Sequence, residues 1–462
     1  MSINRRNFLL GSAAIGIGFG GLGTYFAYKH YTRGYKSQIN GYGPLIEDPK
    51  GIIDLPEGFS YKILSKVGEI MDDGLPLPGL PDGMAAFPGS DGKVIVVRNH
   101  ETNFSHPEMS AFGPNDEYLS KIPENKVFDL GTEGKRGNGG TSTFVYDLNS
   151  EKIEKQYLSL AGTLRNCCGG PTPWGSWLTC EETKAKAEDG LRENHGYVFE
   201  VPASEEIGLV DPIPLRGMGR IYREAAAVDP TSGVVYLTED EGDGIFYRYI
   251  PNTPGKLNEG GKLQALAIKG MPSIDLRNWD ERVAHLNTPF DVEWIDLENI
   301  DNPNNDLRIR GHNKGAAILA RGEGLWYGND ELYISSTSGG PKQLGQIWRY
   351  IPSEFEGQEK ESLSPGKLEL FVEPQDDQLL QKCDNITVAP WGHIFVCEDG
   401  FGEDFIRAIT NEGKVYTIAK NAISSSEWAG VCFSPDGSTM FANIQGEGLT
   451  VSIKGPWDSF KI

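Results

Sequence analysis

The chain has 462 residues and a formal net charge of −22 at pH 7. This excess of carboxylates argues against a nucleic acid or an anionic membrane surface as a partner, because such partners are recognised by a basic face. The 58 glycines and 28 prolines indicate many turns, and the carboxylates are compatible with bound cations or simply with solubility.

Residues 1–30 are predicted to be a targeting segment. Arg5 and Arg6 precede Phe8, and residues 8–27 are uncharged, rich in glycine and mildly apolar. A twin-arginine pair ahead of a weak apolar stretch is typical of a Tat export signal, which makes the Tat machinery a partner. The alternative is an N-terminal membrane anchor, because about 20 uncharged residues can span a bilayer. We expect a periplasmic or secreted protein, anchored only if the segment is not cleaved.

Residues 31–54 are predicted to be a linker, and residues 55–462 one all-β domain. From residue 55 onward, short β-like runs alternate with Gly, Pro, Asn and Asp turns, and long amphipathic helices are scarce. Many short strands with this punctuation are typical of a sandwich, a barrel or a propeller.

The β-like runs form a repeat, in which an apolar strand ends in acidic or amide residues and is followed by a second strand. Long insertions lie at 102–140, 252–320 and 353–382. Radial repetition of such units predicts a six-bladed β-propeller-like fold with insertions between blades, and a sandwich is the alternative. The units are 92–101 with 142–147, 174–182 with 196–202, 233–240 with 244–251, 331–337 with 345–352, 391–399 with 405–409, and 434–445 with 448–453.

Several acidic residues come at equivalent strand ends of this repeat. They are Glu101, Glu181 with Glu182, Glu239 with Asp240, and Glu398 with Asp399. Equivalent strand ends of a propeller gather at one mouth of the central channel, where so many like charges would repel unless they bind cations or keep protons. Oxygen ligands in that number favour Ca²⁺. The alternative is that the acids lie in solvated turns outside the blades.

Residues 166–182 combine a cysteine, a tight turn and terminal carboxylates. Cys167 precedes a Gly-Gly-Pro turn, and Glu182 follows at a strand end. A thiolate with a carboxylate suits iron better than calcium, although a structural cysteine pair is equally compatible. The six cysteines have no C-x-x-C spacing, so a zinc ribbon is not expected. Disulfides and buried free thiols both remain open.

Further candidate residues follow along the chain. Glu224 enters a strand of small residues, where a buried carboxylate needs a partner that its neighbouring arginine could supply. Arg321 and Glu323 flank a glycine and face the same side of an extended segment, so they indicate either a phosphate or carboxylate site or a surface ion pair. Asp384 and Glu427 each precede an apolar strand. No Gly-x-Ser-x-Gly, His-Glu-x-x-His or P-loop motif is present.

In combination, these motifs resemble the PhoX-type alkaline phosphatases from about residue 50 to 457. The motifs are Arg98-Asn99-His100-Glu101, Asn166-Cys167-Cys168-Gly169-Gly170 with Trp177-Leu178-Thr179-Cys180-Glu181-Glu182, Glu224-Ala225-Ala226-Ala227-Val228-Asp229-Pro230, Arg321-Gly322-Glu323-Gly324, Asp384-Asn385 with Pro390-Trp391-Gly392, and residues 427–437 with Asn443-Ile444-Gln445 and Gly455-Pro456-Trp457.

The resemblance implies a Tat-exported, six-bladed enzyme that hydrolyses small-molecule phosphate monoesters. It implies a cofactor of two oxo-bridged ferric ions and about three Ca²⁺ ions. Cys167 would ligate iron, and Arg321 would bind the substrate phosphate, with Asn166 near it. Arg321, Cys167 and Glu182 form the predicted catalytic set. The carboxylates that would hold iron or calcium are Glu182, Glu224, Glu323, Asp384 and Glu427, with Glu101 close by.

Two other functions remain open at this point. One is a Ca²⁺-dependent propeller lactonase or esterase, which would need no thiolate ligand. The other is a non-catalytic propeller used for binding, in which any metal would be structural. We expect a monomer in each case, with no nucleic acid partner.

Overall fold

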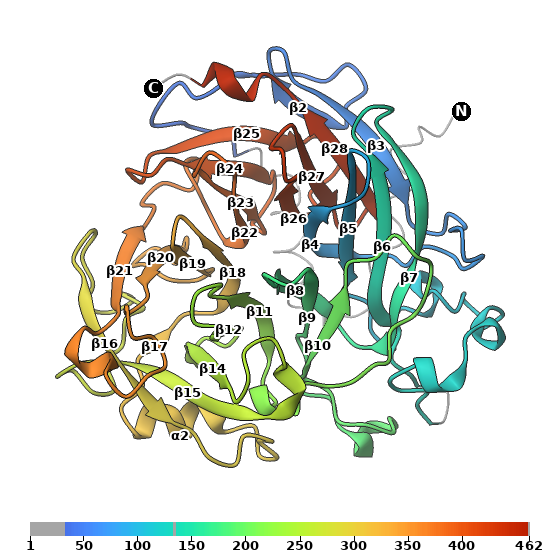
Figure 1. Cartoon of the computed structure of the whole chain (residues 1–462). Helices are drawn as coiled ribbons and strands as arrows, with labels where there is room; N and C mark the ends of the chain where they lie inside the picture. Colours follow the sequence, from blue (N-terminus) through green and yellow to red (C-terminus); the bar gives the residue numbers. More distant parts are fainter. Residues whose placement is uncertain (1–32, 133–134, 461–462) are drawn as a thin grey trace, which may run out of the picture.

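The computed structural model describes residues 33–132 and 135–460, and these form an all-β ring of sheets around a central axis (Figure 1). The predicted all-β class and propeller-like arrangement are confirmed. The predicted targeting segment lies outside the described residues. Within the described ranges, no helix is both long and apolar enough to cross a membrane.

Two four-stranded sheets meet where the ring closes. The first consists of β4 (Pro81–Pro88), β5 (Lys93–His100), β6 (Gly139–Asp147) and β7 (Lys152–Thr163). The second consists of β26 (Trp428–Phe433), β27 (Thr439–Ile444), β28 (Leu449–Lys454) and β3 (Ser60–Lys66). Because β3 comes from the start of the domain and pairs with β28 from its end, the two ends of the chain close the ring together.

A three-stranded sheet and a nine-stranded sheet follow the first sheet around the ring. The three-stranded sheet consists of β8 (Asn166–Pro171), β9 (Ser176–Glu181) and β10 (Val198–Pro202). The nine-stranded sheet runs, in pairing order, through β11 (Arg223–Val228), β12 (Val235–Glu239), β14 (Tyr247–Pro251), β15 (Gly261–Ile268), β16 (Phe290–Asp296), β21 (Lys367–Val372), β20 (Gln346–Ile351), β19 (Glu331–Ser336) and β18 (Gly322–Gly328).

The division into six separate blades is not confirmed among the described residues, because β16 joins two units at their outer edges. It pairs with β15 on one side and with β21 on the other. The insertion that supplies β16 also carries α2 (Leu307–Asn313) and β17 (Ile318–Leu319), which pairs with β13 (Gly244–Ile245). Short 3-10 helices occupy other loops: η3 (Pro107–Met109), η4 (Leu119–Lys121), η5 (Glu124–Lys126), η6 (Ala187–Asp189), η7 (Arg216–Met218), η8 (Leu257–Glu259), η9 (Glu361–Leu363) and η10 (Trp457–Ser459).

The described part of the predicted linker packs onto the domain. A six-stranded sheet begins at the axis with β22 (Cys383–Val388), β23 (Ile394–Glu398), β24 (Phe405–Ile409) and β25 (Val415–Asn421), and β2 (Ile53–Pro56) and β1 (Leu45–Ile46) extend its outer edge. Arg33 is buried and forms an ion pair with Glu398. Residues 33–54 therefore contribute strands and a buried charge pair to the fold.

The strands nearest the axis position the site. In Figure 1 they are β4, β8, β11, β18, β22 and β26, and each contacts the next around the ring. Apolar side chains of neighbouring sheets pack between them; one cluster joins Phe395 of β23 to Trp428 of β26 and Val451 of β28. Since both faces of a sheet are covered in this way, many strands are buried along almost their whole length, polar residues included.

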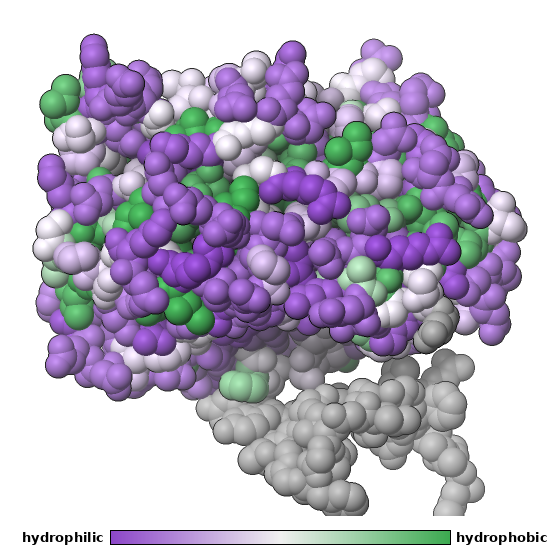
Figure 2. All heavy atoms as spheres, turned by 90° about the horizontal axis from the view of Figure 1, so that it is seen from below, coloured by the Kyte–Doolittle hydropathy of each residue, from purple (hydrophilic) through white to green (hydrophobic). Residues whose placement is uncertain are grey.

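The outer surface is mainly polar. Figure 2 shows hydrophilic side chains over most of one side of the ring, with hydrophobic ones scattered between them.

Candidate metal centre

Each of the six inner strands contains a register shift near its start. The shifts follow Pro81, Asn166, Arg223, Gly322, Cys383 and Ala429. Such bulges bend a strand and re-aim the side chain at the bulge. In the first five inner strands, the residue at the bulge is Asp82, Cys167, Glu224, Glu323 or Asp384.

The sixth inner strand has Gly430 at its bulge. Its φ of +64° is in the left-handed region, and a Cβ there would come within 2.2 Å of the carbonyl oxygen of Asp82. Only glycine therefore fits at this position. The acid of this unit is Glu427, which directly precedes β26.

Backbone hydrogen bonds identify two further rings of equivalent residues. We call the residue just before each inner strand the strand-entry residue, and the residue just after the second strand the strand-exit residue. In every unit, the N–H of the strand-exit residue donates to the carbonyl of the strand-entry residue, at 2.9–3.3 Å. The entry/exit pairs are Leu80/Glu101, Arg165/Glu182, Tyr222/Asp240, Arg321/Thr337, Lys382/Asp399 and Glu427/Gln445.

Three units end their second strand with two consecutive acids, and the two acids of each pair lie in different environments. The pairs are Glu181 with Glu182, Glu239 with Asp240, and Glu398 with Asp399. Successive residues of a strand point to opposite sides, so only the second acid of each doublet is a strand-exit residue. The first acid is held by donors within the fold: Glu239 by Tyr247, and Glu398 by Arg407. The expectation that both acids of each doublet gather at one mouth is therefore corrected for Glu181, Glu239 and Glu398.

The bulge residues and the acidic strand-exit residues form what we call the axial cluster, together with Glu427. Two groups within it bring ligand atoms within 4.8 Å of one another: Cys167 with Glu182 and Glu224, and Glu224 with Glu323 and Asp384. Glu224 belongs to both groups. The members of the cluster are Asp82, Glu101, Cys167, Glu182, Glu224, Asp240, Glu323, Asp384, Asp399 and Glu427.

The axial cluster cannot carry all its negative charges without cations. Burial, followed by the charges of Glu323 and Glu182, raises the pKa of Glu224 well above its usual range. Burial followed by Asp399 raises the pKa of Asp384 to about 8. The same causes, burial first, raise the pKa values of Asp82, Glu182, Glu323 and Glu427 and of the Cys167 thiol. Either protons or multivalent cations must neutralise these groups.

The donor types fit two kinds of metal. The group around Cys167 offers a thiolate with two carboxylates, which suits a transition metal such as iron. The group of Glu224, Glu323 and Asp384 offers only oxygen, which suits calcium. Because a bound cation favours the charged form of each ligand, metal binding would also reverse the raised pKa values.

Two arginines border the axial cluster as strand-entry residues. Arg321 donates from Nε and Nη2 to the carboxylate of Asp240, at 2.6 and 2.9 Å, and from Nη2 to Glu323 at 2.7 Å. Arg165 pairs with Glu101 at 2.6 Å and also with Glu182. Burial alone would lower the pKa of Arg321, but Glu323 and Asp240 outweigh it and raise the pKa, so both guanidiniums stay charged.

Asn166 does not face the cluster. Its Nδ2 donates to the hydroxyl of Thr179 at 2.9 Å, and its Oδ1 accepts from the hydroxyl of Thr163 at 2.6 Å. The side chain is fully buried, and the strand turns the adjacent Cys167 to the other side. These contacts do not bring Asn166 to the axial cluster, and its predicted substrate-binding role stays a prediction.

Asp82, Arg165 and Gln445 are the site residues that the sequence did not indicate. Asp82 is buried, and Gln445 Nε2 donates to it at 2.8 Å and to Glu101 at 2.9 Å. Pro81-Asp82-Gly83 has the composition of a surface turn, so its sequence does not indicate that Asp82 is a potential metal ligand. The signal that could find Asp82 is its position as the second residue of an inner strand, which Asp384 shares.

All six cysteines are buried and free in the described part of the chain, which settles the alternative between disulfides and thiols. Cys167 lies at the cluster, with its Sγ 3.7 Å from the carbonyl oxygen of Glu224. Cys168 faces the other side of β8, where its Sγ is 3.2 Å from the position that a Cβ on Gly83 would occupy. The two adjacent cysteines thus have different environments.

A buried histidine holds the loop that follows Glu182. His195 Nδ1 lies 2.6 Å from Glu181 Oε1, and its Nε2 lies 3.2 Å from Asp129 Oδ2. Burial alone would lower the pKa of His195, but Glu181 and Asp129 outweigh it and raise the pKa to about 9. His195 therefore stays protonated at neutral pH and links two loops to the end of β9.

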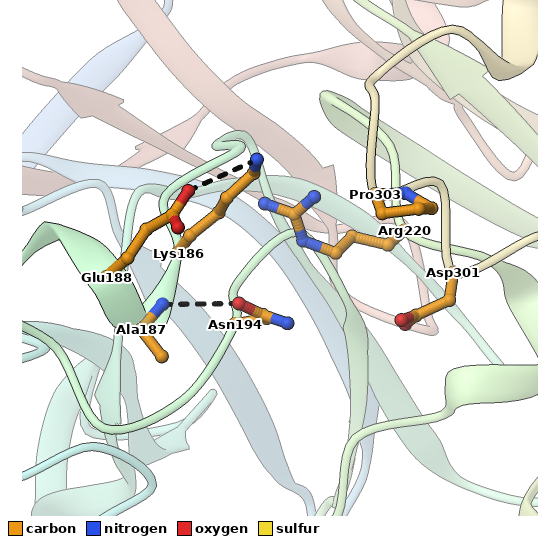
Figure 3. Close-up of a pocket in the computed structure, with 7 residues that line it drawn as sticks. All are labelled: Lys186, Ala187, Glu188, Asn194, Arg220, Asp301 and Pro303. Atoms are coloured by element: carbon orange, nitrogen blue, oxygen red, sulfur yellow. Dashed lines mark hydrogen bonds and ion pairs between the residues drawn. The ribbon is translucent and has the colours of Figure 1, made fainter.

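A surface pocket of about 330 Å³ lies beside the same loop (Figure 3). Arg220, at its wall, donates from Nη2 to the carbonyl of Ala185 at 3.0 Å, which secures the loop from this side. No member of the axial cluster lines the pocket. Its lining residues are Lys186, Ala187, Glu188, Asn194, Arg220, Asp301 and Pro303.

His195→Gln should remove a pH-dependent part of the stability. Because the folded pKa of His195 is raised to about 9, its contribution is complete below the unfolded value of about 6.5 and is lost as the pH rises through 9. The shift corresponds to about 3 kcal/mol. Calorimetric unfolding from pH 6 to 10 should show the difference between wild type and variant shrinking across this window. Parallel curves would contradict the charged bridge.

The sequence was compared with protein-family models and with curated proteins, and the fold with solved structures. A family model described as alkaline phosphatase PhoX matches residues 40–448. The fold is similar to that of Pseudomonas fluorescens PhoX in complex with vanadate, a transition-state analogue, with 17% identity, a TM-score of 0.62, and coverage of 92% of this chain and 98% of that one. The gluconolactonase XC5397 of Xanthomonas campestris gives 9% identity, a TM-score of 0.44 and coverage of 90% and 98%. No curated protein sequence gave a match.

Proposed function

The chain belongs to the PhoX alkaline phosphatase family and is a phosphatase, and we propose that it hydrolyses phosphate monoesters at the axial cluster with the help of bound metal ions. The observation that carries this proposal is the convergence of mostly buried or half-buried carboxylates and one buried thiol on a single axis, bordered by arginines. Such a set of acids can stay ionised only when cations neutralise it.

The two ligand groups support different metals. We assign iron to Cys167, Glu182 and Glu224, and calcium to Glu224, Glu323 and Asp384, because of their donor types. Asp82, Glu101 and Glu427 would complete the shell around them. When bound, the ions would supply the positive charge that a transferred phosphoryl group requires.

Arg321 is the proposed ligand of the substrate phosphate. Asp240 and Glu323 occupy its Nε and Nη2 and hold the planar fork in place, while no hydrogen bond within the described ranges engages its Nη1. A guanidinium oriented in advance by carboxylates can bind a phosphate oxygen without reorganising. Arg165, fixed in the same way by Glu101 and Glu182, is the corresponding cation on another side of the cluster.

The vanadate complex of the similar Pseudomonas fluorescens protein supports this assignment by analogy. Vanadate is described there as a transition-state analogue. A fold of the same kind in this chain would present its axial cluster and Arg321 to a phosphoryl group. In phosphoryl transfer, positioning and charge stabilisation contribute more than a covalent protein group.

We further propose that the enzyme is exported through the Tat route as a monomer. The twin-arginine segment at residues 1–30 supports this route. Because Tat substrates cross the membrane folded, the metals could be loaded before export. The substrate would then be a small phosphate ester outside the cytoplasm.

Metal analysis together with turnover tests the proposal. Purified protein should contain iron and calcium and should hydrolyse p-nitrophenyl phosphate. EDTA should lower the rate on the order of a hundredfold, because removing calcium leaves the acids to repel one another and the phosphate. Added Ca²⁺ should restore the rate. Folded, Ca²⁺-loaded protein with neither iron nor phosphatase activity would overturn the proposal.

A further inference from the structure

One sector of the axial site has cations but lacks an acidic strand-exit residue. Arg321 and Lys382 are strand-entry residues of consecutive units, and the strand-exit residue between them is Thr337. The Thr337 N–H donates to the carbonyl of Arg321 at 3.0 Å. Its hydroxyl donates to the carbonyl of Cys383, the residue after Lys382, at 2.7 Å. Arg321 and Lys382 therefore flank one hydrogen-bonded residue that carries no charge.

The other cationic strand-entry residues are neutralised by carboxylates. Arg165 pairs with Glu101 and Glu182, the strand-exit residues on both of its sides. Arg321 pairs with Asp240 and Glu323. Lys382 is half-buried, yet its Nζ forms no hydrogen bond or ion pair with any residue in 33–132 or 135–460. The ammonium group of Lys382 is therefore available to an anionic ligand.

The backbone holds Lys382 in this position. Its φ is +46°, in the left-handed region, as are the φ of Arg165 at +47° and of Arg321 at +49°. The strand-entry residue Leu80 shares this conformation, with a φ of +44°, so the ring geometry imposes it at several equivalent positions. Hydrogen bonds at both backbone groups impose it here, from Lys382 N–H to the carbonyl of Leu344 and from Asp399 N–H to the Lys382 carbonyl.

Arg321 and Lys382 hold equivalent positions in neighbouring units, because each is the strand-entry residue whose carbonyl accepts from the strand-exit N–H. A pair of cations placed together at the edge of an acidic cluster favours an anion that contacts both. Arg321 already has a role toward the scissile phosphate, and Lys382 has none.

Resting on the proposed function, we propose that Lys382 binds a second anionic group of the substrate, beside the scissile phosphate at Arg321. The preferred substrates would then be phosphate esters that carry another phosphate or a carboxylate close to the scissile phosphate. Lys382 would be a specificity-determining residue, because it acts on the substrate outside the group that reacts.

Binding of two non-hydrolysable ligands distinguishes recognition of a second anionic group by Lys382 from binding of the phosphate itself. Propylphosphonate and 3-phosphonopropionate share a phosphonate, and only the second carries a carboxylate. Calorimetry on the metal-loaded wild type should show that 3-phosphonopropionate binds about tenfold more tightly, the range expected for one charge-assisted hydrogen bond. Lys382→Met should remove this preference, and Lys382→Arg should keep most of it. Lys414→Met, at an exposed lysine, should leave it unchanged.

The outcomes distinguish the two proposals. An equal affinity of wild type for the two ligands, or a preference that survives in Lys382→Met, would overturn the role of Lys382 even if the protein hydrolyses p-nitrophenyl phosphate. If the protein hydrolyses no phosphate ester but loses the carboxylate preference in Lys382→Met, the proposed function fails and the anion site stands. Binding and turnover are measured separately, so each result is assigned to one proposal.

Discussion

Glu224→Gln should lower the turnover of p-nitrophenyl phosphate on the order of a thousandfold, because one residue serves both ligand groups. Glu224 lies within 4.8 Å of Cys167 and Glu182 on one side and of Glu323 and Asp384 on the other. An amide replaces the shared carboxylate with a neutral, weaker ligand. Both iron and calcium should therefore be depleted in the purified variant.

The same substitution should not destabilise the metal-free protein. Without metals, burial and the neighbouring acids raise the pKa of Glu224 well above its usual range, so a neutral side chain removes a source of repulsion. Thermal unfolding after EDTA treatment should give a Tm equal to or above that of wild type. Glu281→Gln, at an exposed glutamate, is the matched control. A Glu224→Gln enzyme with activity within tenfold of wild type would refute the shared-ligand role.

Cys167→Ala should remove iron while leaving most of the calcium. Cys167 belongs only to the group with Glu182 and Glu224, and the all-oxygen group does not include it. Thiolate ligands favour iron over calcium, so the effect should be selective. Turnover should fall on the order of a hundredfold or more, as expected when a catalytic metal is lost. Elemental analysis and the visible absorption of a thiolate-bound ferric ion measure the two effects.

The adjacent cysteine provides the control for this experiment. Cys168 is also buried but faces the opposite side of β8. Cys168→Ala should therefore keep iron, its visible absorption and most of the activity. A Cys167→Ala protein that retains iron and turnover would instead favour a calcium-dependent hydrolase, the alternative that needs no thiolate.

The sequence predicted the propeller-like ring because its repeat is local. Each unit carries its own turn, apolar strand and terminal acid, and these patterns lie within short windows. The fused outer edges were not predictable in the same way, because β16 lies in a long insertion and pairs with β21, the last strand of the next unit. The pairing of β2 with β25 was not predictable for the same reason, since more than 360 residues separate Asp54 from its partner Lys420.

Among the predicted metal ligands, the structure brings Cys167, Glu182, Glu224, Glu323 and Asp384 into two groups. Asp82 escaped notice because Pro81-Asp82-Gly83 has the composition of a turn. Glu181, Glu239 and Glu398 were also expected at the axial mouth, because the sequence of two consecutive acids does not reveal which one faces the axis. The roles of Arg321 and Glu427 in metal and substrate binding stay predictions.

By itself the sequence determined the all-β class, the repeated unit and the acids and thiol available at the strand ends, because these depend on neighbours in the chain. Only the tertiary structure decided which of them meet. The bulge at the start of each inner strand sets the direction of one side chain per unit, and ring closure brings these side chains onto one axis. The sector without an acidic strand-exit residue is likewise a property of the ring. The neutral Thr337 has a consequence only because folding places Arg321 and Lys382 on either side of it.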